Sequence, residues 1–541
     1  MEKTTDYSDI LINVWHLNPE DVQQAKEYYK KTDEDIFTEI QTYTLVAGIK
    51  DIKNDFALID IYPEAFSLIR PEVYTDVGNA KIVARRNKGV MYFCDALGWM
   101  VYNADSGAWE SNTHKAQARC IEYTDDLMEE AKRQYLEELD TAPKKKSGKI
   151  EFSAATKELM AHALKSQSRA GVQNMLELTK AFANVKASVF DADPYALNTP
   201  AGIVDLRTGE TRPHDPKAFC IHTTAYAPED KGAALWNDFI DLITCGDKDL
   251  ALFLQLNAGM CAIGEITHEY TAFAIGGGRN GKSTYYGALS LVMGDYAGSI
   301  EADAITKKNE NRFSFSGIRG KRLVTCGELE QGAVLSTKAL KKISSAQDKF
   351  TLEQKYKDAE EVPRTFHLTL FTNFLPRVDA MDGGTWRRIK VIPFNATMPA
   401  GEKEIKDYSR YLADHAGGAI LKWIIDGAVL FCKQRKNIKD PAAVVKATTG
   451  YKDAEDWLTP FLQDCCTVDT DDRYLRAGVN DLRKAWAIYA KAHNLVSRSN
   501  AEFDEAMENK GFKKIPIGGH RMAWQGVGIN DTTGRTDPYK D

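Results

Sequence analysis

An eight-residue run near the middle of the chain limits its fold more than any other feature. Residues 276–283 read Gly-Gly-Gly-Arg-Asn-Gly-Lys-Ser and fit the pattern G-x-x-x-x-G-K-[ST]. In this pattern the glycines let backbone N–H groups face phosphates, the lysine reaches the β- and γ-phosphates, and the hydroxyl ligates Mg²⁺. An apolar run at 270–275 can form a strand entering the loop, and 284–293 a helix leaving it, ended by Gly294. This order predicts an α/β nucleotide-binding core. The predicted binding residues are Gly276, Gly277, Gly278, Arg279, Asn280, Gly281, Lys282, Ser283 and Thr284.

Two acids follow the next apolar strand and are candidates for metal binding and hydrolysis. Residues 321–326 lead into Glu328 and Glu330, 46 residues after Lys282. One carboxylate is needed to hold Mg²⁺, together with Ser283, and another to polarise the attacking water. The spacing alone does not say which glutamate has which role, and both could instead be solvated loop carboxylates. We assign the metal to Ser283 and Glu328.

An amide and a pair of arginines complete the candidate site. Asn373 follows the strand expected at 366–372, where α/β sheets bind ligands, and could orient the lytic water. Arg387 and Arg388 precede a strand at 389–394. Paired arginines are usually surface solubilisers, but an arginine supplied by a neighbouring subunit can stabilise the charge of a phosphoryl-transfer transition state.

A basic and aromatic segment lies between the acids and Asn373. Residues 350–358 alternate like a strand and carry Lys355, Tyr356 and Lys357 near an expected hairpin tip. Basic side chains can follow a phosphate backbone while aromatic rings stack on bases. We therefore expect these three residues to contact DNA.

Composition is that of an ordinary globular protein. Hydrophobic residues make up 43% and charged residues 27% of the 541, which excludes fibrous and wholly disordered classes and predicts several domains. The net charge of −7 is concentrated at the N-terminus, where residues 1–80 hold 16 acids against 7 Lys and Arg. The nine cysteines are scattered without a C-x-x-C pair, which fits a reducing compartment. No run reaches the ~18 uncharged apolar residues of a membrane helix, and there is no secretory signal, so we expect a cytoplasmic protein with no membrane partner.

Taken in order between Gly276 and Phe394, these motifs resemble those of the superfamily 3 helicases of viruses, phages and plasmids. The similarity is greatest to the phage/plasmid and poxvirus-type primase-helicase family. Residues 191–216, followed by Trp236-Asn237-Asp238-Phe239, are similar to the signature of that family's helical region, except that Ala201-Gly202 stands where the family has Asn-Gly. The resemblance covers about residues 85–400 and, more weakly, the C-terminal winged-helix-like region, and does not include residues 1–80.

The resemblance implies an ATP-driven ring, usually a hexamer of AAA+-like subunits, that encircles DNA and moves 3′→5′ on a single strand. It gives nucleotide binding to Gly276, Gly281, Lys282 and Ser283. It also gives the Walker B role to Glu328 with Glu330 beside it, the sensor role to Asn373, the trans arginine to Arg387 or Arg388, and DNA contact to Lys355 and Lys357. The expected cofactors are ATP and Mg²⁺, and the expected partners are single-stranded and forked DNA, further copies of the chain and a separately encoded primase. The expected location is the cytoplasm of a bacterial host carrying a phage or mobile element.

The expected fold class is multidomain α/β, with an AAA+-like P-loop ATPase core between an N-terminal helical or mixed collar region and a C-terminal winged-helix-like domain. We expect an acidic docking module at 1–80, the collar at 81–235, the motor at 236–455 and the winged-helix-like domain at 456–541. The expected helices are 19–29, a Glu- and Lys-rich helix between 111 and 142, 153–166, 171–184, those within 235–264 and 400–435, 455–465, 478–493 and 500–510. The expected strands are 56–62, two or three within 89–111, 270–275, 321–326, 366–372, 389–394 and a hairpin at 512–529.

Two other functions are compatible with the same core. In a replication initiator, the winged helix would recognise duplex DNA and the motor would mainly melt it. An unrelated P-loop GTPase or small-molecule kinase would carry a lid or an N-K-x-D guanine motif, and no N-K-x-D occurs after Lys282.

Overall fold

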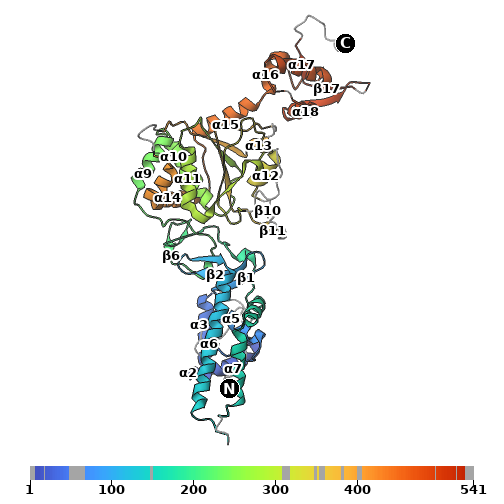
Figure 1. Ribbon diagram of the computed structural model, residues 1–541. Helices are drawn as coiled ribbons and strands as arrows, with labels where there is room; N and C mark the ends of the chain where they lie inside the picture. Colours follow the sequence, from blue (N-terminus) through green and yellow to red (C-terminus); the bar gives the residue numbers. More distant parts are fainter. Residues whose placement is uncertain are drawn as a thin grey trace, which may run out of the picture. The chain divides into compact units, whose positions relative to one another are not determined.

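The computed structural model describes residues 6–17, 19–47, 68–145, 150–306, 317–346, 350–352, 360–378, 383–398, 405–493, 495–496, 498–519 and 521–530. The chain divides into two compact units, Met1–Tyr102 with Glu110–Val189, and Asn103–Trp109 with Phe190–Asp541. A mixed multidomain fold with a parallel sheet confirms the coarse expectation (Figure 1). The finer division into four segments stays a prediction.

The first unit begins with a small helical core. Its elements are α1 (Tyr7–Asp9), η1 (Ile10–Val14), α2 (Pro19–Tyr29) and α3 (Asp33–Ala47). Leu11, Val22, Ile36 and Ile40 are buried together there. The helix expected at 19–29 is confirmed, whereas the strand expected at 56–62 lies outside the described residues.

A larger core follows in the same unit. Its elements are α5 (Asp76–Arg86), β1 (Met91–Cys94), β2 (Gly98–Asn103), β3 (Ala108–Ser111), α6 (Thr113–Leu139), α7 (Ala154–Ser166), α8 (Arg169–Thr179) and η4 (Ala187–Val189). Asn79 is buried in α5, accepts a hydrogen bond from the Tyr123 hydroxyl (3.0 Å) and donates one to Ser166 Oγ (2.8 Å). The expected boundary at residue 80 falls inside α5, whose Ile82 and Val83 share this core.

The second unit contains the sheet that positions the candidate site. Small antiparallel strands and two helices come first: β4 (Ala196–Thr199), β5 (Gly202–Asp205), β6 (Thr211–Arg212), η5 (Pro216–Ala218), α9 (Ala233–Ile243) and α10 (Lys248–Ala262). The central sheet is built from β7 (Thr271–Ile275), β8 (Ala297–Ile300), β9 (Leu323–Cys326), β12 (His367–Thr372) and β13 (Ile389–Pro393). Its order is β13-β7-β12-β9-β8 and its pairs are all parallel. The carboxyl ends of β7, β12 and β9 therefore lie side by side at one edge.

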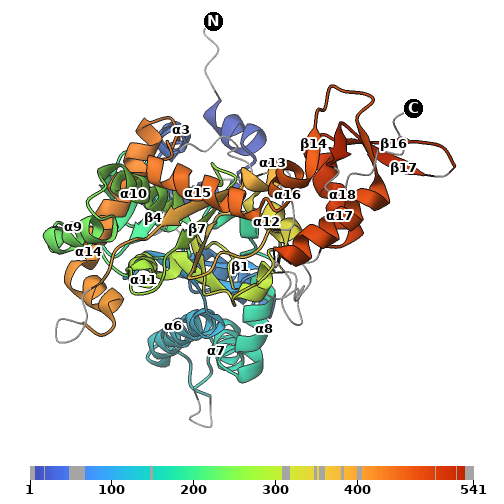
Figure 2. The same ribbon diagram turned by 90° about the horizontal axis from the view of Figure 1, so that it is seen from above.

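Apolar helices cover this sheet. The helices α11 (Lys282–Met293) and α14 (Tyr408–Lys433) pack with α9 and α10 beside it (Figures 1 and 2). Glycines allow α10 and α14 to approach closely, because a Cβ on Gly259 would lie 2.1 Å from the backbone nitrogen of Ala428. Among the described residues, α14 alone is long and apolar enough to span a membrane by length and composition. Of its most apolar stretch, 61% is buried inside the protein, as in the core helix of a globular domain.

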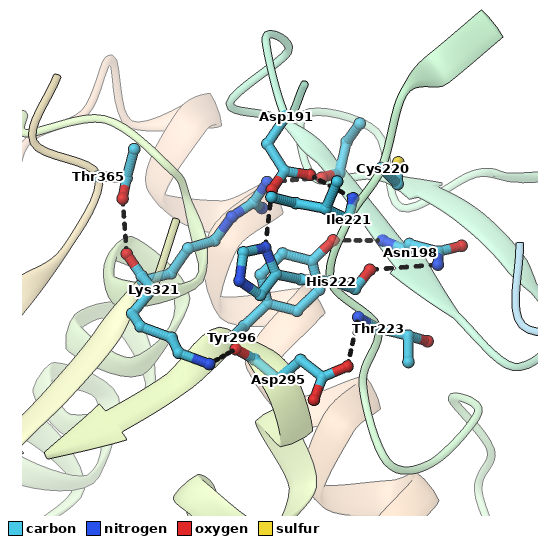
Figure 3. A network of polar contacts seen from close by, with 12 residues as sticks. Asp191, Asn198, Cys220, Ile221, His222, Thr223, Asp295, Tyr296, Lys321 and Thr365 are labelled. Atoms are coloured by element: carbon cyan, nitrogen blue, oxygen red, sulfur yellow. Dashed lines mark hydrogen bonds and ion pairs between the residues drawn. The ribbon is translucent and has the colours of Figure 1, made fainter. Parts of the chain in front are cut away.

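A network of polar contacts connects residues of the segment 191–223 with one another and with Tyr296, which directly precedes β8 (Figure 3). The Asp191 carboxylate lies 2.7 Å from His222 Nδ1 and accepts a hydrogen bond from the backbone N–H of Ile221 (3.1 Å). The Tyr296 hydroxyl, just before β8, accepts the backbone N–H of Asn198 in β4 (3.1 Å). This network fixes the edge of the sheet that carries β8.

The remaining elements of the second unit lie around the sheet and in the C-terminal part of the chain. The shorter ones around the sheet are η6 (Gly294–Tyr296), η7 (Ala302–Ala304), α12 (Thr337–Ser344), β10 (Phe350–Leu352), β11 (Glu360–Val362) and α13 (Gly383–Trp386). The C-terminal ones are α15 (Ala442–Glu455), α16 (Leu458–Cys465), β14 (Cys466–Val468), β15 (Arg476–Gly478), α17 (Val479–Ala492), α18 (Asn500–Asn509), β16 (Lys513–Pro516), β17 (Met522–Gln525) and β18 (Val527–Ile529). The three helices after residue 455 and the β16–β17 hairpin match the expected order, and β15 pairs with β17 to give the order β15-β17-β16. Helix α15 was not expected.

Candidate functional site

The glycine-rich loop leaves the carboxyl end of β7 and turns into α11. Glycine is required at two of its positions. A Cβ on Gly276 would lie 2.0 Å from Asn280 Nδ2 and 2.5 Å from the carbonyl oxygen of Phe394. Gly281 is the N-cap of α11 and has φ 82°, and a Cβ there would lie 2.5 Å from Ile243 Cγ2. Side chains are thus excluded where the loop passes its neighbours.

Lys282 is the first residue of α11, and only 4% of its surface is exposed. Its ammonium group donates to the carbonyl oxygen of Gly276 (2.9 Å), to Asn280 Oδ1 (2.9 Å) and to Asn373 Oδ1 (3.0 Å). Burial lowers the pKa of Lys282, and the charge of Glu328 opposes that shift. The Lys282 ammonium group is therefore a positive charge that is largely shielded from solvent and that donates its hydrogen bonds to neutral oxygens.

Asn373 connects the lysine to an acid. It follows β12, which lies between β7 and β9. While its oxygen accepts from Lys282, its Nδ2 donates to Glu328 Oε1 (3.2 Å). One amide thus links a cation from the loop after β7 to a carboxylate after β9. The structure brings together the three residue types that the sequence predicted to act jointly.

These groups open into a cavity of about 600 Å³. Its lining residues are Leu242, Gly278, Arg279, Asn280, Gly281, Lys282, Ser283, Thr284, Glu328, Asn373, Met398, Ile405, Lys406, Asp407, Tyr408 and Ser409. Gly276, Gly277 and Glu330 are not among them. No sequence motif marks Leu242, Met398 or residues 405–409, so their place in the cavity could not be predicted.

Oxygen ligands suitable for Mg²⁺ are present in this cavity. Within the described parts of the chain, no group of three or more His, Cys, Asp and Glu side chains could hold a metal by itself. Ser283 and Glu328 line the same cavity, and Mg²⁺ in nucleotide sites takes most of its other ligands from phosphates and water. The donor set fits a magnesium ion that arrives with a nucleotide.

The two arginines lie at the other edge of the sheet, at the start of β13. The side chain of Arg388 is 12% exposed, donates to the carbonyl oxygen of Gly384 (2.7 Å) and lies 3.3 Å from a Glu269 carboxylate oxygen. The side chain of Arg387 is 66% exposed and lies 3.8 Å from Glu269. Neither lines the cavity, so the structure does not unite the arginines with the lysine of the same chain.

The predicted DNA-contacting residues Lys355, Tyr356 and Lys357 lie outside the described residues. The strands that flank them are described: β10 and β11 form an antiparallel pair in which Phe350 is the register partner of Val362. Their expected contact with DNA stays a prediction.

Comparisons with known proteins give a consistent relationship. Residues 80–245 match the model of the family described as D5 N terminal like, and residues 274–388 match a family of unknown function, DUF5906. The chain is 27% identical over 213 residues to "Putative helicase L207/L206" of Acanthamoeba polyphaga mimivirus, covering 38% of this chain and 22% of that protein. It is 21% identical over 281 residues to "Putative helicase 022R" of Frog virus 3 (isolate Goorha), covering 48% of this chain and 29% of that protein.

The chain thus spans less than a third of the length of these curated relatives. Among solved structures, the chain is similar to the apo A form of the NrS-1 C-terminal region, with 12% identity and a TM-score of 0.36. The aligned part covers 56% of this chain and 77% of that one. The expected resemblance to the poxvirus-type primase-helicase family is confirmed in coarse form: residues 80–245 are D5-like, and the chain is similar to viral proteins named as helicases.

Proposed function

We propose that this protein is an ATP-dependent replicative DNA helicase of superfamily 3, encoded by a phage or other mobile element. It would work as a ring, most simply a hexamer, that translocates on single-stranded DNA and unwinds duplex. The observation that carries the proposal is the Lys282–Asn373–Glu328 chain of hydrogen bonds at a nucleotide-sized cavity. Its three residues follow three neighbouring parallel strands, β7, β12 and β9. Its location at the carboxyl ends of the strands is where α/β sheets bind ligands.

Each residue of the cavity then has a chemical role in hydrolysis. The loop amides and Lys282 neutralise phosphate charge, and Ser283 and Glu328 would hold Mg²⁺, which supplies further neutralisation. Glu328 is the better of the two acids for activating water because it lines the cavity and Glu330 does not. Asn373, already bonded to both charged groups, positions the water and responds to the γ-phosphate.

The arginine requirement is best met by a second copy of the chain. Arg387 is exposed and lies at the amino ends of the parallel strands, whereas Lys282 lies at their carboxyl ends. It can therefore serve a neighbour's nucleotide more readily than its own. We assign the trans role to Arg387 and a structural role to Arg388.

The C-terminal elements weigh on the choice between helicase and origin-binding initiator. Their order suits a winged helix, in which the third helix commonly reads duplex DNA. Here that helix would be α18, which carries Glu502, Asp504, Glu505 and Glu508 and no Lys or Arg. A helix with four acids is repelled by phosphates, so we favour the helicase. DNA contact is proposed for Lys355, Tyr356 and Lys357, with single-stranded and forked DNA as ligands, a separate primase as partner and the bacterial cytoplasm as location.

ATP turnover by the purified chain tests the proposal. Lys282→Ala should reduce hydrolysis to background, and Lys248→Ala, which removes an exposed lysine of α10, should not. Chelation of Mg²⁺ should also stop hydrolysis. Turnover that survives Lys282→Ala would reject the nucleotide site.

A further inference from the structure

The cavity has a second part that phosphate chemistry does not use. Beside the glycine-rich loop it is lined by Leu242, Met398, Ile405 and Tyr408. These residues come from the end of α9, the segment after β13 and the start of α14. Leu242 is 40% and Ile405 46% exposed. Charged phosphates gain nothing from such side chains, so their place in a nucleotide-sized cavity needs another explanation.

Leu242 lies off the core-facing side of its helix. The buried residues of α9 are Trp236, Phe239, Ile240 and Ile243, spaced three and four apart as on one helical face. Leu242 does not belong to that set. An amphipathic helix would carry a polar residue at such a position, and the leucine instead lines the cavity.

Two other apolar lining residues, Tyr408 and Met398, contact neighbouring elements. The Tyr408 ring packs edge-on against Phe239, with centroids 5.7 Å apart, and burial raises the pKa of its hydroxyl. The backbone N–H of Met398 donates to the carbonyl oxygen of Arg279 (2.8 Å), which ties this wall to the glycine-rich loop. The apolar wall and the phosphate loop are thus parts of one fixed surface.

The polar groups nearby are engaged in starting α14. Asp407 has φ 49°, and its Oδ1 accepts the hydroxyl of Ser409 (2.8 Å) and the backbone N–H of Arg410 (3.3 Å). Non-helical dihedrals at Ala416 (φ −141°, ψ 15°) separate the first two turns of α14 from the rest of the helix. Of these first turns, Tyr408 and Ser409 line the cavity.

We propose that Leu242, Met398, Ile405 and Tyr408 form the nucleoside subsite of this pocket, with the base against the apolar wall and the phosphates on the loop. The inference rests on the proposed function and names the part of the nucleotide that the motif does not bind. An aromatic base has apolar faces that suit this wall, and a cavity of about 600 Å³ is within the usual range for small-molecule sites. A polyphosphate alone would leave the wall in water.

Comparison of two ligands separates this subsite from the phosphate loop. We would measure the affinity of the full chain for a non-hydrolysable ATP analogue and for inorganic tripolyphosphate, with Mg²⁺, by calorimetry. In the double variant Leu242→Ser/Ile405→Ser, affinity for the ATP analogue should fall about tenfold, the size expected from losing partial burial of two aliphatic side chains. Affinity for tripolyphosphate should stay at the wild-type value.

A matched control removes the effect of exposed leucines in general. Leu252 of α10 is 41% exposed, a fraction close to the 40% of Leu242, and it does not line the cavity. Leu252→Ser should leave both affinities unchanged. If the double variant loses affinity equally for both ligands, or for neither, the subsite is overturned and the assignment of the phosphate loop stays intact. Failure of the wild-type chain to bind either ligand would overturn the subsite and the proposed function together.

Discussion

At the scale of single residues, Lys282 lies where burial of its positive charge costs free energy. It is almost fully buried, and its three acceptors are neutral oxygens. Such a position lowers affinity for the proton and leaves the charge available to an anion that can displace the amide oxygens. A residue under this constraint is more useful to function than to stability.

The pH dependence of stability should report this burial. Because the pKa of Lys282 is lowered from 10.5, the unfolded chain binds a proton that the folded chain has lost between the lowered pKa and 10.5. Stability should therefore rise with pH across that window. The difference in unfolding free energy between wild type and Lys282→Ala, followed by chemical denaturation, should contain this rise. A difference that is flat with pH would contradict a depressed pKa.

Glu328 and Glu330 should differ in effect although they are two residues apart. Glu328→Gln keeps the shape of the side chain and removes the carboxylate, so we expect ATP to bind with very slow hydrolysis. Glu330→Gln should have a smaller effect because Glu330 does not line the cavity. Nucleotide binding and single-turnover hydrolysis measure the two steps separately. Loss of binding equal to loss of turnover in Glu328→Gln would indicate that the acid mainly holds the metal.

At the scale of elements, the close contact between α10 and α14 supports the sheet. Since a Cβ on Gly259 would lie 2.1 Å from a backbone atom of α14, Gly259→Ala should destabilise the protein by about 1–3 kcal/mol, the usual cost of overpacking. Gly450→Ala is the control, because α15 leaves open space there. That change should be neutral or stabilising by about 0.5–1 kcal/mol. Thermal unfolding of the two variants should move in opposite directions, and equal shifts would contradict the described packing.

The two arginines at the start of β13 should separate into a structural and a functional residue. Arg388→Ala removes a buried guanidinium from Gly384 and Glu269 and should cost about 1–3 kcal/mol of stability. Arg387→Ala should leave stability nearly unchanged and lower ATP turnover by about 10³–10⁵ without weakening ATP binding. Unfolding and turnover assays on both variants check this. The reverse pattern would exchange their roles.

Local sequence predicted the elements of the site better than their arrangement. The strand, glycine loop and helix around Lys282 were predictable because the residues that specify them lie in one continuous segment, 270–293. The position of β12 between β7 and β9, which brings Asn373 between Lys282 and Glu328, is a tertiary property that spacing does not encode. Leu242 was not predictable for a related reason, since an apolar residue in an apolar segment looks like core until its burial is known. Ile405 is a single apolar residue among charged ones, and only the structure places it in the cavity. Helix α15 was missed because Thr448, Thr449 and Gly450 weaken its helical pattern.

At the scale of the whole molecule, the separation of lysine and arginine on opposite edges of the sheet favours a shared site. If Arg387 completes a neighbour's pocket, a single copy of the chain has an incomplete enzyme. Hydrolysis and strand separation should then both require assembly. Each ring position would contribute Lys282 to one site and Arg387 to the next.

Strand separation on a forked duplex, read by release of a labelled strand, tests this account most directly. With ATP, the wild-type chain should release the strand, while Lys282→Ala alone and Arg387→Ala alone should not. A mixture of the two variants should recover part of the activity, because an intact lysine on one subunit can face an intact arginine on the next. A wild-type chain that hydrolyses ATP without releasing the strand would contradict the helicase assignment, and a mixture that assembles yet stays inactive would contradict the shared site.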